Sequence, residues 1–199
     1  MSVDQLMGEV RKDAVFYRRS GGGVTFSGGE PLQQASFLVE CLRRCQLWGY
    51  HTTVETCGQT SWADLRAAAE HTDLFLYDVK HLDPERHRQY TGHDNRRILG
   101  NLVRLLDIGA RVVVRVPIVP SCNDDADNVR ALAIFAAEHQ LIRCIELLSY
   151  HRLGLHKYAA VGAPPPSPLE EPRSDSLESM RRYVADVSGV ECKVTLSFK

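Results

Sequence analysis

The 199-residue sequence lacks long apolar runs and has almost no net charge. No stretch approaches the roughly 18 consecutive apolar residues of a membrane-spanning helix, and residues 1–13 lack the apolar core of a secretion signal. A formal net charge of −1 offers no electrostatic basis for binding nucleic acid or an anionic membrane. These absences predict a cytoplasmic protein whose partners include neither nucleic acid nor a membrane.

Cysteines are few and scattered. Because no secretion signal is evident, we expect reduced thiols rather than a disulfide framework. Metal or cluster ligation needs closely grouped cysteines, and only Cys41 and Cys45 lie close together. Both fall on the apolar stripe of a predicted helix at residues 31–48, so we interpret them as small core residues. The remaining thiols are Cys57, Cys122, Cys144 and Cys192.

Short apolar runs alternate with amphipathic stretches, and 44% of the residues are hydrophobic, enough to bury a core. Repeated strand–helix alternation favours an α/β fold with a parallel sheet and right-handed crossovers. We expect a single domain over residues 1–199, interrupted by a proline-rich loop at 163–175. The predicted strands are 24–26, 51–55, 74–78, 112–116, 145–148 and 191–198. The predicted helices are 2–17, 31–48, 62–70, 98–108, 129–139 and 176–187.

Polar residues follow five of these strands. Catalytic and binding groups in parallel α/β folds gather at the carboxyl ends of the strands. Periodicity leaves open whether the sheet is open or closed, but both arrangements direct attention to the same places. Those strand ends are residues 27–30, 55–58, 78–80, 115–120 and 149–151.

The first strand end, GGGVTFSGGEPL at residues 21–32, is the most informative segment. A phosphate loop would need a Lys-Ser/Thr pair after its last glycine, and a dinucleotide fingerprint would place its glycines after the strand. Simple tight turns remain an alternative. Glu30 directly after Gly28 and Gly29 instead indicates an acceptor-rich cradle for an ammonium group, since glycines let backbone carbonyls approach a ligand.

This segment resembles the signature of radical S-adenosylmethionine enzymes of the pyruvate formate-lyase-activating type, and the similarity continues in register to the C-terminus. The resemblance implies a partial, open (β/α) barrel of the radical S-adenosylmethionine type, here missing its first strand. It also implies that the chain is N-terminally truncated, with Met1 an internal methionine or the start of an expressed domain. A degenerate paralogue is the third interpretation.

The resemblance implies a role for residues at each strand end. The methionyl ammonium of the cofactor would be held by Gly28, Gly29 and Glu30. A monovalent cation would be held by Glu55, Thr56 and Asp78. Further cofactor contacts would come from Asp78, Val79, Lys80, Arg115 and His151. The matching segments are ETCG at 55–58, YDVK at 77–80, VRVPIVP at 114–120, NDD at 123–125 and YHRLGLHKY at 150–158.

Each of these residues also has a purely structural interpretation. Lys80 fits a solvated lysine after a strand, Asp78 a turn cap, and Thr56 a residue that favours strands. Arg115 fits an ion pair with Glu146 or Asp78. His151 and His156 fit loop histidines, because their i, i+5 spacing is not that of a helical metal pair.

The implied activity is generation of a glycyl radical on a pyruvate formate-lyase-like partner. It would use S-adenosylmethionine and a [4Fe-4S] cluster, with flavodoxin or ferredoxin as electron donor. The family's Cys-x3-Cys-x2-Cys ligand motif is absent from the sequence; after Cys41 and Cys45 its third position is Trp48. We therefore assign no catalytic residue and expect this chain alone to be inactive. A non-catalytic cofactor- or partner-binding remnant and a barrel lyase using Lys80 as a Schiff base are the alternatives.

Overall fold

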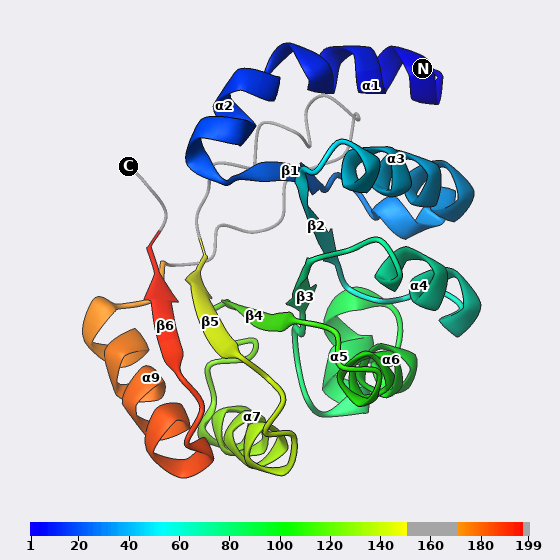
Figure 1. The fold of residues 1–199 in the computed structure, drawn as a ribbon. Helices are drawn as coiled ribbons and strands as arrows, with labels where there is room; N and C mark the ends of the chain where they lie inside the picture. Colours follow the sequence, from blue (N-terminus) through cyan, green and yellow to red (C-terminus); the bar gives the residue numbers. More distant parts are fainter. Residues whose placement is uncertain (151–170, 197–199) are drawn as a thin grey trace. The chain divides into compact units, whose positions relative to one another are not determined.

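The structure is a computed structural model, and it describes residues 1–150 and 171–196. Its centre is an open six-stranded parallel sheet whose strands follow one another in chain order (Figure 1). The strands are β1 (Gly23–Phe26), β2 (His51–Thr56), β3 (Leu74–Asp78), β4 (Val112–Ile118), β5 (Cys144–Ser149) and β6 (Cys192–Thr195). The helices are α1 (Val3–Lys12), α2 (Ala14–Ser20), α3 (Ala35–Leu47), α4 (Trp62–Ala69), α5 (Pro84–Thr91), α6 (Arg96–Asp107), α7 (Ala126–Glu138) and α9 (Ser174–Ser188). The α/β class and the open parallel sheet are confirmed.

The chain divides into two compact units. The first comprises residues 1–78 and 96–113, and the second comprises residues 79–95 and 114–199. Strands β1 to β3 belong to the first unit, β5 and β6 belong to the second, and β4 begins in one and ends in the other. The single domain over residues 1–199 stays a prediction. In the described part of the chain, no helix is both long and apolar enough to cross a bilayer.

The N-terminal helix of the first unit begins where the sequence predicts but ends early. Ser2 caps α1 in a capping box with Gln5. At Asp13 the backbone leaves the helical region, with φ −94° and ψ 7°, and a second helix starts at Ala14. The predicted single helix at 2–17 was wrong in this respect. The Asp13 amide bonds to the Val10 carbonyl, three residues back, so the last turn of α1 tightens and the helix ends there.

The predicted helix at residues 31–48 is also divided. Residues Pro31–Gln34 form a 3-10 turn, and α3 starts only at Ala35. The core of this region comes from α1, α3 and the residue before β2: Met7, Val10, Cys41, Cys45 and Tyr50 pack together as one buried cluster. The two cysteines are fully buried, so their interpretation as small core residues is confirmed.

The register between β2 and β3 is stabilised by a polar contact at their amino ends. The carboxylate of Asp73 accepts hydrogen bonds from the amide (2.8 Å) and the hydroxyl (3.0 Å) of Thr52. The two strands then run in parallel, with Thr56 opposite Tyr77. This pairing places the carboxyl ends of β2 and β3 side by side within the first unit.

The second unit contains a helix that the sequence analysis missed. Asp83 caps α5 through the amides of Glu85 and Arg86, Pro84 occupies the first helical turn, and Gly92 ends the helix in the left-handed region. Its residues are almost all polar, so no apolar stripe marks it. The last helix, α9, begins at Ser174, two residues before the predicted start. Most of the predicted proline-rich loop lies outside the described residues.

Candidate functional site

The loop after β1 presents backbone groups with little side-chain cover. Gly28 has φ +139°, and a Cβ built on Gly28 or Gly29 would meet no atom within 4 Å. Neither glycine's carbonyl oxygen accepts a hydrogen bond from the residues that the structure describes. Exposed, unbonded carbonyl oxygens are acceptors for a cationic or N–H-bearing ligand, and the ammonium cradle at this loop stays a prediction.

The carboxylate of Glu30 accepts hydrogen bonds from other groups of this chain. Its Oε1 accepts hydrogen bonds from the Leu32 amide (3.2 Å) and the Thr56 hydroxyl (2.7 Å). Its Oε2 accepts from the Cys57 amide (3.0 Å) and from the Cys57 thiol (3.1 Å). Four donors occupy the four lone-pair positions of a carboxylate. The side chain therefore ties the glycine loop to the end of β2, across 26 residues of sequence.

The end of β2 is in turn held by a packed network. The Thr56 hydroxyl, which donates to Glu30, accepts the amide of Gly58 (2.9 Å). The Gly58 carbonyl accepts the side-chain amide of Asn101 (2.9 Å). The Tyr77 hydroxyl donates to the carbonyl of Ile98 (2.7 Å), and burial raises the pKa of this phenol well above its usual value. These hydrogen bonds hold the glycine loop and the carboxyl end of β2 in place.

The predicted cation site is brought together only in part. Glu55 and Thr56 end β2 and Asp78 ends β3, at adjacent positions of paired strands. Thr56, however, uses its hydroxyl between Glu30 and Gly58, and Glu55 accepts the Ser27 hydroxyl at 2.8 Å. Within the described residues, no group of three or more His, Cys, Asp or Glu side chains is arranged to hold a metal ion.

In the second unit, the segment after β3 runs beside β4. The Val79 amide donates to the Arg115 carbonyl (2.8 Å), and Val79 is buried whereas Lys80 is exposed. Asn123 is buried and its side-chain amide holds the carbonyl of Lys80 (2.7 Å). Arg115 lies with its Nε 4.0 Å from Glu146 Oε2, so one of its predicted structural partners is present.

The predicted histidines carry no structural test. His151, His156 and the rest of the segment 151–158 lie outside the described residues.

Cys41 and Cys45 are described, and burial raises the pKa of the Cys45 thiol to about 11. Cluster ligation needs the thiolate, so these two core cysteines do not fit an iron–sulfur cluster.

Sequence reasoning missed the donors that surround Glu30. Cys57 was quoted only as part of the ETCG match, yet its amide and thiol both bond to Glu30. Asn123 was quoted only as part of an acidic turn, yet its side chain joins Lys80 to the backbone around Pro117 and Val119. The one local signal that could have identified Cys57 and Asn123 is that each is a polar residue of moderate size beside a strand end.

Residues 1–133 match the family profile described as the Radical SAM superfamily. Over 166 residues the chain is 42% identical to a (2S)-3-sulfopropanediol dehydratase activating enzyme of Klebsiella oxytoca, covering 82% of this chain and 52% of the relative. Over 159 residues it is 45% identical to an isethionate sulfite-lyase activating enzyme of Oleidesulfovibrio alaskensis, covering 79% of this chain and 51% of the relative. The chain thus spans about half the length of these curated relatives.

A solved structure with the same fold is a domain of the pyruvate-formate lyase-activating enzyme from Bacteroides vulgatus. The TM-score is 0.74 at 26% sequence identity, and the match covers 87% of this chain and 99% of that domain. The open parallel sheet is therefore an architecture that a domain of an activating enzyme adopts.

Proposed function

The chain belongs to the radical SAM superfamily, and from that premise we propose that it is the S-adenosylmethionine-binding part of an enzyme that activates a glycyl-radical enzyme. The relatives named above activate enzymes of this kind with different substrates. One observation carries the proposal: a loop of exposed carbonyl acceptors is braced against the end of β2 by a fully bonded carboxylate. Such preorganisation suits a ligand that must be held in one orientation.

In this proposal the ammonium of the cofactor's methionyl group lies against the carbonyls of Gly28 and Gly29. Glu30 acts as the brace of that loop, and its negative charge favours a nearby cation. S-adenosylmethionine, when bound, supplies the radical chemistry for which the superfamily is named. The contacts expected of Val79, Lys80, Arg115 and His151 stay predictions.

The partner would be a glycyl-radical enzyme, pyruvate formate-lyase-like or one of the other classes that the relatives activate, and flavodoxin or ferredoxin the electron donor. Family membership implies a [4Fe-4S] cluster. The described residues do not fit one, because no three of their cysteines lie together, and Cys41 and Cys45 are buried in the core. We derive no step through the cluster.

The barrel-lyase alternative has no observation in its favour. A Schiff-base lysine is activated by desolvation in an apolar pocket or by a neighbouring cation. Lys80 is exposed, and its residue contributes its carbonyl to Asn123 rather than its amine to a buried site.

A chimera tests the proposed function directly. The 159 aligned residues of the Oleidesulfovibrio alaskensis relative are replaced by those of this chain, and the glycyl radical formed on isethionate sulfite-lyase is measured by electron paramagnetic resonance. We expect this chimera to give a radical signal. The same chimera with Glu30→Ala should give a signal at least roughly tenfold weaker, since a misplaced binding group can lower a reaction rate by about a hundredfold. A chimera that carries normal iron and yields no radical would contradict the proposal.

A further inference from the structure

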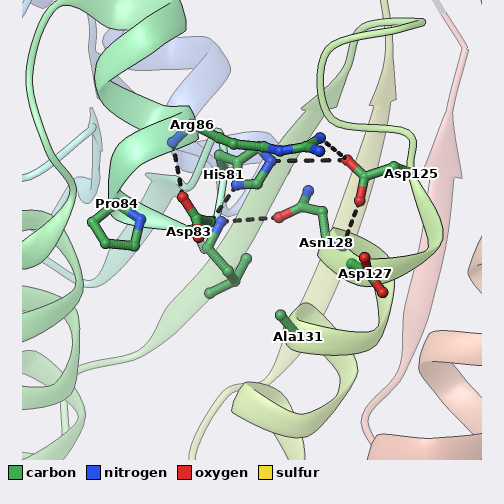
Figure 2. Close-up of a pocket in the computed structure, with 9 residues that line it drawn as sticks. His81, Asp83, Pro84, Arg86, Asp125, Asp127, Asn128 and Ala131 are labelled. Atoms are coloured by element: carbon green, nitrogen blue, oxygen red, sulfur yellow. Dashed lines mark hydrogen bonds and ion pairs between the residues drawn. The ribbon is translucent and has the colours of Figure 1, made fainter.

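The second unit contains a pocket that none of the proposed cofactor contacts explains. Its volume is about 430 Å³, within the range of small-ligand sites. It lies between the amino-terminal ends of α5 and α7 (Figure 2). The lining residues are His81, Leu82, Asp83, Pro84, Arg86, Asp125, Asp127, Asn128 and Ala131. We call it the His81 pocket.

His81 is a buried hydrogen-bond donor that faces this pocket. Its residue is only 3% exposed, and its Nδ1 accepts the amide of Asp83 at 2.9 Å. Because Nδ1 accepts this amide hydrogen it carries no proton, so the ring is neutral with its hydrogen on Nε2. Burial lowers the pKa of the imidazole in the same sense. Nε2 has no hydrogen-bond partner in the described part of the chain, and the carboxylate oxygen of Asp125 is 3.9 Å away.

Most other polar groups of the pocket are already engaged. Asp83 caps α5. Asp125 caps α7 and receives the Arg86 guanidinium at 3.0 Å. The Asn128 side chain bonds to the Leu82 amide. Asp127, in the first turn of α7, is exposed, and its carboxylate has no hydrogen-bond or ion-pair partner among the described residues.

The charge of the lining selects the class of ligand. Three aspartates against one arginine leave a net charge of −2 with His81 neutral. An anion would be repelled, and a metal ion would meet the hydrogen of Nε2 instead of a lone pair. Besides the remaining N–H groups of Arg86, the groups left over are one buried N–H donor at His81 and one open carboxylate at Asp127. They suit a ligand that carries both a carbonyl acceptor and a cationic amine.

We propose that the His81 pocket binds a lysine or arginine side chain of a protein partner, the cation at Asp127 and a main-chain carbonyl of the same segment at His81 Nε2. His81 directly follows Lys80, so the pocket lies beside a residue expected to contact the cofactor. The choice of a peptide over a free amine rests on the proposed function, which requires a protein partner. The hydrogen bonds and the charge of the pocket do not depend on it.

The test uses the full 199-residue chain and a lysine blocked as its N-acetyl N-methylamide. Binding is followed by nuclear magnetic resonance at the His81 Nε2–H and at the backbone amides of Asp127 and Asn128. We expect saturable shifts at these groups. Asp127→Asn weakens the affinity about threefold, the effect of an exposed ion pair, and Asp127→Glu restores it. Glu138→Gln, an exposed carboxylate at the far end of α7, is the matched control and leaves the affinity unchanged.

Three outcomes overturn the proposal. If blocked norleucine binds as tightly as blocked lysine, the positive charge has no role. If butylamine binds as tightly, the ligand is a free amine and not a peptide. Unchanged signals from His81 and Asp127 at the highest soluble probe concentration would mean that the pocket does not bind this chemistry. None of these measurements involves the glycine loop or S-adenosylmethionine, so their failure leaves the proposed function to its own tests.

Discussion

Replacing Gly58 with alanine is expected to destabilise the protein by about 3–5 kcal/mol. Gly58 has φ +68°, where a non-glycine residue is strained. A Cβ there would also overlap the hydroxyl and the ring of Tyr77. Tyr77 is fully buried and its hydroxyl bonds to Ile98, so the ring has no room to withdraw. The free energy of unfolding in urea measures the effect.

Gly49→Ala is the matched control for this prediction. Gly49 has a similar left-handed backbone, with φ +73°, but a Cβ there would meet no atom within 4 Å. It should therefore show the conformational cost alone, about 1–2 kcal/mol. If the two variants lose the same stability, the contact between the β2 end and Tyr77 is not the constraint that the structure indicates.

Replacing Glu30 with glutamine is expected to cost about 2–4 kcal/mol of stability and to free the glycine loop. Glutamine has one side-chain oxygen, so its amide group would face two of the four donors that now bond to the carboxylate. Thr56 is buried, and its hydroxyl hydrogen cannot turn to solvent. Amide hydrogen exchange at Leu32 and Cys57 should accelerate together with the loss of unfolding free energy.

Glu9→Gln provides the comparison, because Glu9 lies on α1 of the same unit and its carboxylate pairs with the exposed amine of Lys12. An exposed ion pair of this kind contributes little, so the cost should stay below about 1 kcal/mol. A Glu30→Gln variant no less stable than Glu9→Gln would contradict the bracing role of Glu30.

The sheet could be predicted from sequence because its strands are short apolar runs bounded by turn signals. Residues 74–78 were predicted with the bounds that β3 has. Local capping chemistry also identified Ser2 as the start of α1. Helix α5 was missed because it has hardly any apolar residues, although Asp83, Pro84 and Gly92 mark its two ends.

The arrangement of the candidate site could be predicted only in part. The strand ends and Glu30 were identified, because a glycine-rich segment followed by a carboxylate is visible along the chain. The partners of Glu30 were not, since Thr56 and Cys57 are 26 and 27 residues away and only the parallel pairing of β1 and β2 brings them close. The unbonded Nε2 of His81 is likewise a property of tertiary packing that no local pattern encodes.

We propose that the glycine loop of this chain is a cradle for S-adenosylmethionine. The most direct test is a titration of the isotope-labelled chain with S-adenosylmethionine, followed at its backbone amides. We expect saturable shifts centred on Gly28, Gly29 and Cys57, which Glu30→Gln weakens. Shifts confined to other parts of the chain, or none at the highest soluble concentration, would contradict this proposal.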